Sequence, residues 1–306
     1  MAITKYAIPA DVIDWLRDQF KHCNETVSQK LSKIPTFHET LYDQSLIEFL
    51  STVSAPRRLP SGWLVRIETH FLGGRSFFHN WEIADIGILI TFRAGGRVIK
   101  TKLALLQSKK LYPNEQKLIR TQQLEHDLAI GFGRLLTPQA VFQNETAKRH
   151  FTLTKDSRYK SLRVGGQQDQ RIAAYEGEFS IPVHYLFYNP LDLPWTVAFP
   201  VEAQTSSRHA CKVGCRVIRA TDVRALVKPK QKLTPKYSDL STLANPQPSV
   251  TFNAGWSLED FVVNLVIGCL EGHSYEGSGG ELVRNVFYRR SYPISAAFSV
   301  SISSPE

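Results

Sequence analysis

The chain has 306 residues, of which 42% are hydrophobic and 21% are charged, as in a globular protein with a sizeable core. No apolar run approaches the ~20 residues that a transmembrane helix needs, so we expect no membrane-spanning segment. The first residues contain no signal-peptide core, and we therefore expect a cytoplasmic protein.

Basic residues outnumber acidic ones, 37 to 28, which gives a formal net charge of +9. Excess positive charge favours a polyanionic partner, because lysine and arginine neutralise phosphates and release counterions. The sequence contains no ATP-binding P-loop and no other nucleotide-binding fingerprint. Any dependence on ATP would therefore come from a partner chain.

Two helices are expected at the start of the chain. An apolar stripe predicts the first helix over residues 9–31. Pro35-Thr36 opens the second helix, with Thr36 as N-cap and Glu39 three residues later, which is a capping-box pattern. Glu39 and Asp43 are four residues apart, so they share one face of this helix.

A β-hairpin follows a strand that we expect over residues 63–71. Two runs of β-branched and aliphatic residues, Ile86 to Phe92 and Val98 to Leu106, flank the turn Ala94-Gly95-Gly96. Both runs are apolar on both faces near the middle, which is typical of central strands covered on two sides.

Three polar residues lie at the open end of this hairpin: Asp85 at the start of one strand, and Gln107 and Lys109 at the end of the other. In an antiparallel pair, opposed residues point to the same face, and a shift of one residue reverses this. A plain two-residue turn at Gly95-Gly96 would put Asp85 on the face opposite to Gln107. We therefore predict an odd-length loop within residues 94–97, or a β-bulge between residues 85 and 107.

A helix is expected next, from Pro113 or Asn114 to about Leu136. We divide the chain into a core with its N-terminal helices, residues 1–136, and an additional α+β region, residues 137–306, which completes the sheet or binds DNA or a partner. In the second region the pattern predicts strands at 181–188, 197–201 and 210–219, a loop at 228–249, and a helix capped by Ser257.

The arrangement of Asp85 before Gln107-x-Lys109 resembles the PD-(D/E)XK nuclease superfamily, and the Gln-x-Lys variant is similar to its Mrr-like branch of bacterial defence nucleases. The match covers residues 37–134 and departs from the usual pattern twice: Ala84 replaces the proline, and Gln107 replaces an acidic residue. The resemblance implies an α/β fold with an αβββα restriction-endonuclease-like core, in which helices flank a mixed sheet.

The resemblance also implies cleavage of DNA with Mg²⁺ or Mn²⁺, in defence against foreign (phage) DNA. Asp85 and Gln107 would hold the cation, because hard cations prefer oxygen ligands. Lys109 would stabilise the charge on the phosphate. The accessory acids would be drawn from Glu39, Asp43 and Glu82, and weaker candidates for contact with nucleic acid are Lys110, Lys117 and Arg120.

Two alternatives stay open from the sequence. The glutamine and the missing proline are compatible with a non-catalytic nucleic-acid-binding or assembly subunit that has a degenerate nuclease fold. Glu39 has a second interpretation as a helix-capping residue. DNA is the expected partner, and further candidates are a second protein of a defence system, such as an ATPase subunit, and a second copy of the chain.

Overall fold

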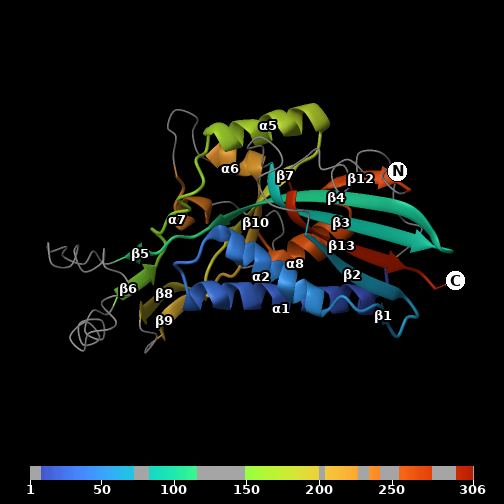
Figure 1. Cartoon of the computed structure of the whole chain (residues 1–306), viewed down its shortest axis with the longest axis horizontal. Helices are drawn as coiled ribbons and strands as arrows, with labels where there is room; N and C mark the ends of the chain where they lie inside the picture. The colour runs from blue at the N-terminus through green and yellow to red at the C-terminus, as the bar shows by residue number, and fades with distance from the viewer. Residues whose placement is uncertain are drawn as a thin grey trace, which may run out of the picture.

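The structure is a computed structural model that describes residues 8–71, 83–115, 149–199, 204–226, 234–241, 255–277 and 294–305. Within these ranges it is an α/β fold, with a large mixed sheet between two layers of helices and a smaller antiparallel sheet at one end (Figure 1). None of the helices in these ranges is both long enough and apolar enough to cross a membrane.

Two N-terminal helices cover one face of the large sheet: α1 (Ala10–Lys33) and α2 (Glu39–Thr52). Both expected helices are confirmed, but the capping box of α2 is wrong. Helix α2 has His38 as N-cap with no side-chain cap, and Glu39 is the first helical residue. The Glu39 carboxylate accepts its hydrogen bonds outside α2, from strand β4 and a later loop, and so does not cap its own helix.

The hairpin is formed by β3 (Ala84–Ala94) and β4 (Arg97–Lys110). Its turn is the two-residue Gly95-Gly96, with φ of 53° and 71°, where a residue with a Cβ atom would be strained. The register shifts beyond Phe92↔Lys100, because Arg93 pairs with Val98 and leaves Ile99 as an extra residue. The predicted β-bulge is therefore confirmed.

The large sheet is mixed and has nine strands among the residues that the structure describes. β3 pairs in parallel with β13 and antiparallel with β4, whose other edge pairs with β12 and β7. The order is β1 (Arg57–Arg58), β2 (Leu64–Phe71), β13 (Ile294–Ser303), β3, β4, β7 (Val183–Tyr188), β10 (Arg216–Arg219) and β11 (Trp256–Ser257), with β12 (His273–Glu276) beside β4.

The last strand, β13, lies between β2 and β3, so the expected first strand of the core does not neighbour the hairpin. Strands from beyond residue 136 thus share one sheet with β3 and β4. The boundary expected at that residue lies in 116–148, outside the described residues.

The smaller sheet joins β5 (Asn114–Glu115), β6 (Arg149–Leu153), β8 (Asp192–Phe199) and β9 (Gln204–Lys212). The helix expected to start at Pro113 or Asn114 is wrong at its start, because Asn114 pairs with Thr152 as a strand. The remainder of that helix lies outside the described residues. The strand expected over 210–219 is split between β9 and β10, because the chain leaves one sheet and enters the other at Val213–Cys215.

Helices α5 (Gln167–Phe179) and α6 (Ala220–Leu226) lie on the opposite side of the large sheet from α1 and α2 (Figure 1). The short helix α7 (Tyr237–Leu240) lies near the smaller sheet. The helix capped by Ser257 is confirmed, since the Ser257 hydroxyl accepts from Asp260 N. It begins as α8 (Leu258–Asp260) and continues as the π-helix η3 (Phe261–Ile267).

Candidate active site

The candidate site lies at the open end of the hairpin, where β4 continues past the first residue of β3. There the side-chain amide of Gln107 donates a hydrogen bond to the Asp85 carboxylate. The backbone N–H of Ser108 donates to the same oxygen of Asp85 at 2.7 Å. The bulge thus brings Asp85 and Gln107 to one face, and the strand itself orients the carboxylate.

The last four residues of β4 divide between the two faces of the sheet, because side chains alternate along a strand. Gln107 and Lys109 share the face that carries Asp85. Ser108 and Lys110 point to the other face, toward α2: the Ser108 hydroxyl donates to Asp43 at 2.5 Å. All four residues of this segment are buried, so both faces of the strand end are covered.

Glu39, at the first position of α2, reaches around the strand end to both faces. Its Oε1 accepts from Lys110 N at 2.8 Å and from the hydroxyl of Ser161. Its Oε2 lies 4.0 Å from Lys109 Nζ, and the two side chains are 19% and 4% exposed. An acid and a lysine with little exposure therefore face each other at this strand end, and the accessory role expected of Glu39 stays a prediction.

Asp43 lies behind the strand and is buried. Its Oδ1 accepts from Ser108 Oγ and, at 2.6 Å, from the phenol of Tyr188. Burial raises the pKa of Asp43 to about 6, although these two hydrogen bonds oppose the shift. Asp43 is thus linked to Asp85 through Ser108, whose hydroxyl contacts the first acid and whose N–H contacts the second.

Lys110 is buried, and its ammonium group stays within the protein. The group donates to the carbonyl oxygen of Phe37 and lies 4.5 Å from the centroid of the Tyr112 ring. Burial lowers the pKa of Lys110 to about 8. This position favours a role in holding α2 against β4 more than the contact with nucleic acid predicted from the sequence.

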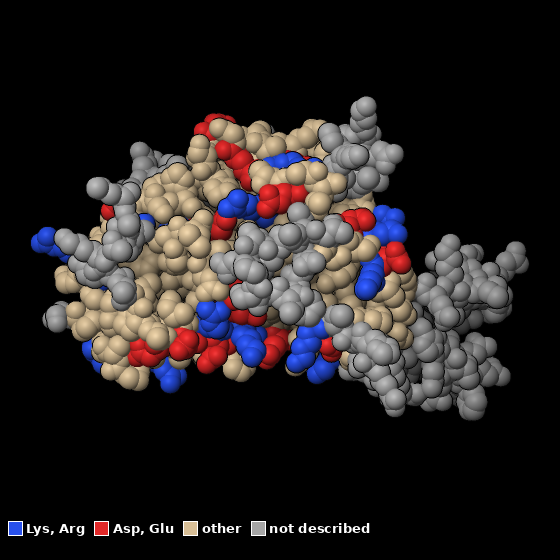
Figure 2. All heavy atoms as spheres, turned by 180° about the vertical axis from the view of Figure 1, so that it is seen from behind, with Lys and Arg blue, Asp and Glu red and all other residues tan. Residues whose placement is uncertain are grey.

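Three other candidates, Glu82, Lys117 and Arg120, lie outside the described residues, so their predicted roles stay predictions. Lys and Arg form no continuous patch on the described part of the face in Figure 2. There Lys and Arg side chains lie beside Asp and Glu.

Oxygen atoms at the site meet part of the needs of a hard divalent cation. Gln107 Oε1 is buried and lacks a hydrogen-bond partner in the described structure, so it is an oxygen free to bind a cation. No group of three or more His, Cys, Asp or Glu residues within the described ranges could form a cage. Mg²⁺ commonly uses one or two protein carboxylates and keeps several waters, and the pair Asp85 and Gln107 fits that mode.

No protein-family model matches this chain, and no curated protein or solved structure matches it. Support for a function therefore comes from the residues and their geometry.

The sequence alone missed three residues that shape the site: Ser108, Ser161 and Tyr188. Ser108 could have been found, because strand alternation puts it on the face opposite to its neighbours Gln107 and Lys109. Ser161 and Tyr188 reach the site from segments far away in the sequence, and no local pattern marks them.

Proposed function

We propose that this chain is a divalent-metal-dependent endodeoxyribonuclease that cleaves foreign DNA. The observation that carries the proposal is the bulged hairpin, which gives Asp85 the same face as Gln107 and Lys109. A hairpin with a purely structural role does not need these side chains on one face, and it does not need two buried lysines at its end. The assignment to defence rests on the resemblance to Mrr-like nucleases and is analogy.

The order of elements supports the finer fold assignment. Helix α2 is followed, after the two-residue strand β1, by β2, β3 and β4. Helix α5 comes after β5 and β6 of the smaller sheet, and β7 then runs parallel to β4. We propose that these elements form a restriction-endonuclease-like core, into which β13 is inserted as an additional strand.

Each residue at the strand end has a role in the proposed reaction. Asp85 and Gln107 Oε1 would hold Mg²⁺ or Mn²⁺, which activates water and stabilises charge on the phosphodiester. Lys109 donates to the non-bridging phosphate oxygens, where charge develops, and its low exposure strengthens this interaction. Glu39 orients the lysine ammonium group, whose Nζ lies 4.0 Å from its Oε2.

A nicking assay on supercoiled plasmid with Mg²⁺ or Mn²⁺ tests the proposal. We expect Lys109→Met to reduce the rate by about 100-fold or more, the loss typical of a donor that stabilises developing charge. Lys102→Met is the matched control, because Lys102 is a buried lysine earlier in the same strand. A Lys109→Met protein that is folded and nicks at the wild-type rate overturns the assignment.

The alternative function is a non-catalytic subunit that binds nucleic acid or assembles a defence complex. It is favoured by the hydrogen bond from Gln107 to Asp85, which satisfies the carboxylate without a metal. The same experiment separates the two functions, since a wild-type protein that binds DNA but leaves it intact with both metals supports the subunit.

A further inference from the structure

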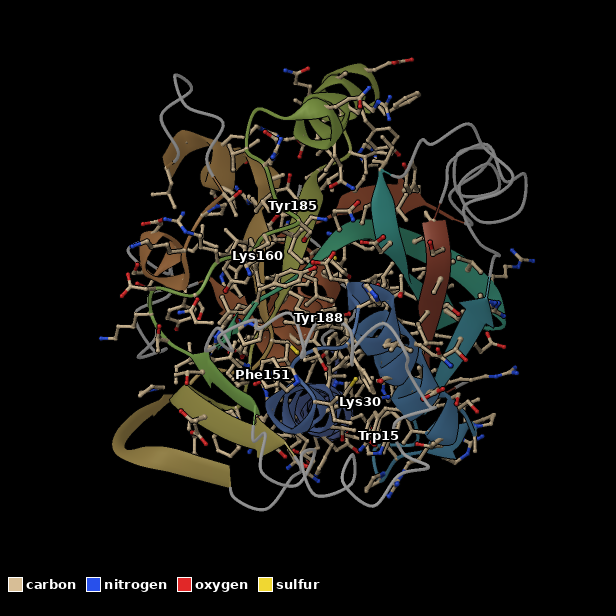
Figure 3. All side chains as sticks on the ribbon, turned by 60° about the vertical axis from the view of Figure 1, so that its left-hand side comes forward. Trp15, Lys30, Phe151, Lys160, Tyr185 and Tyr188 are labelled. Carbon is tan, nitrogen blue, oxygen red and sulfur yellow. The ribbon has the colours of Figure 1, made fainter. Side chains whose placement is uncertain are left out.

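A loop from the second half of the chain lies against the candidate site. This basic loop, residues 155–166, connects β6 to α5. The Ser161 hydroxyl donates to Glu39, and Lys160 Nζ lies 5.7 Å from the centroid of the Tyr112 ring. Lys160 is labelled in Figure 3, in which the left-hand side of Figure 1 comes forward. The loop therefore borders the place where the proposed function puts the scissile phosphate.

Buried side chains hold the basic loop in one conformation. Tyr159 is 1% exposed, its phenol donates to Asn189 at 2.6 Å, and its ring centroid lies 4.5 Å from that of Phe187. Leu162 and Val164 are also buried in the core. Such anchoring means that a ligand of the loop does not have to order it first, which saves conformational entropy on binding.

The basic side chains of the loop alternate with these anchors and are exposed. Lys160 and Arg163 have no carboxylate partner among the residues that the structure describes. By contrast, the guanidinium of Arg158 donates to the carbonyl of Thr234 at 2.8 Å. The acid of the loop, Asp156, pairs with Lys236 at 2.8 Å. Lys160 and Arg163, which flank Ser161 in the sequence, are thus available cations near the contact of the loop with Glu39.

We propose that Lys160 and Arg163 bind phosphates of the DNA strand on one side of the scissile phosphate. This inference rests on the proposed function and adds the path of the substrate: from Lys109, past Glu39 and Ser161, onto the basic loop. The fixed pair fits a chain of regularly spaced phosphates, and arginine can bind a phosphate with two parallel hydrogen bonds. Such contacts position the strand and carry no base information, so they fit a surface that is indifferent to sequence.

The test measures binding of a fluorescent DNA duplex by anisotropy, with Ca²⁺ in place of Mg²⁺, over a range of salt concentrations. We expect Lys160→Ala/Arg163→Ala to weaken binding by about 10- to 50-fold at 0.1 M salt. The salt slope should become shallower by about 0.9 for each lost phosphate contact. The loss should be similar for duplexes of different sequence, and in the cleavage assay it should appear in KM.

The matched control is Arg57→Ala/Arg58→Ala, which removes the same charge from the exposed strand β1. That strand follows the far end of the 14-residue α2, roughly 20 Å from Glu39 at 1.5 Å per residue. We expect this control to retain wild-type affinity and salt slope.

The possible results separate the inference from the proposed function. Equal losses in both double variants mean that net charge alone is responsible, and this overturns the inference. A wild-type protein that nicks DNA while Lys160→Ala/Arg163→Ala binds it normally also overturns the inference but leaves the nuclease standing. A wild-type protein that neither binds nor nicks DNA, or that binds only RNA duplex, contradicts both the inference and the proposed function.

Discussion

The amide of Gln107 donates to the carboxylate of Asp85 across the first rung of the β3–β4 hairpin. A neutral donor at this position satisfies the hydrogen bonding of the carboxylate, where two acids would repel each other. The pair is thus compatible with a folded site both with and without a bound cation.

Replacing Gln107 with glutamate should make the stability of the site dependent on metal. In Gln107→Glu two carboxylates meet, and without metal the pKa of one must rise. A raised pKa in the folded state means that stability is lost as pH rises through it. We expect a lower Tm in EDTA at pH 8, recovery at lower pH, and recovery with Mn²⁺, all measured by thermal unfolding.

The control for this prediction is the double variant Asp85→Asn/Gln107→Glu, in which the repulsion is removed. It should regain most of its Tm in EDTA and lose the response to Mn²⁺. A Gln107→Glu protein whose Tm is unaffected by both pH and metal would show that the two side chains do not share a cation.

Asp43 should impose a pH dependence on stability. Its pKa rises from 3.8 to about 6 on folding, mainly through burial, so the native state binds this proton more tightly than the unfolded state. Its contribution is therefore fully present below pH 3.8 and is lost as pH rises through 6, at up to about 1.4 kcal/mol per pH unit. Asp43→Asn keeps an oxygen for Ser108 and Tyr188 and should flatten the pH profile of urea unfolding. If the unfolding free energies of the wild-type and Asp43→Asn proteins change with pH in parallel, the raised pKa of Asp43 is contradicted.

Glu39 can be tested as an acid and as a hydrogen-bond acceptor separately. Glu39→Gln keeps an oxygen for Lys110 N and Ser161 but removes the charge beside Lys109. We expect at least about a 10-fold loss of nicking with an unchanged Tm. The free energy of unfolding of Glu39→Ala should in addition fall by about 1–3 kcal/mol, because the backbone N–H of Lys110 is left unpaired. If Glu39→Gln nicks DNA at the wild-type rate, the charge of Glu39 has no part in catalysis and the residue has only a structural role.

Arg224 should contribute strongly to stability at a distance from the site. It pairs with Asp169, whose side chain is 2% exposed, at 3.1 Å, and with Glu176. Arg224→Ala should lower the free energy of unfolding by about 3 kcal/mol, because the buried Asp169 loses this cationic partner and keeps only its hydrogen bonds from Gly165 N and the Tyr185 phenol. The exposed pair Lys236–Asp156 is the comparison, and Lys236→Ala should cost less than about 1 kcal/mol. Similar losses of unfolding free energy in the two variants, measured by urea unfolding, would contradict the expected effect of burial.

The local features of the hairpin could be predicted from the sequence because they depend on nearby residues. Gly95-Gly96 fixes the turn, the apolar runs fix the strands, and the requirement that Asp85 share a face with Gln107 predicts the bulge. The spacing of Glu39 and Asp43 likewise put both acids on the helix face that meets β4.

The remaining features depend on contacts between distant segments. Asn114 follows a helix-starting proline, yet it pairs with Thr152, so tertiary pairing overrides the local signal. Helix α5 was not predicted, since its first turn, Gln167 to Gln170, is polar like the loop before it. No local pattern could predict that β13 pairs with β3, because the two strands are about 200 residues apart.

The position of β13 also sets the order in which the protein can be completed during translation. Strand β3 leaves the ribosome early, but the strand that covers one of its edges, residues 294–303, follows only after some 200 more residues. An uncovered edge of this kind is prone to pair with other chains. In a nascent chain this edge of the Asp85 hairpin therefore stays open to wrong pairing until residues 294–303 have been synthesised and β13 docks.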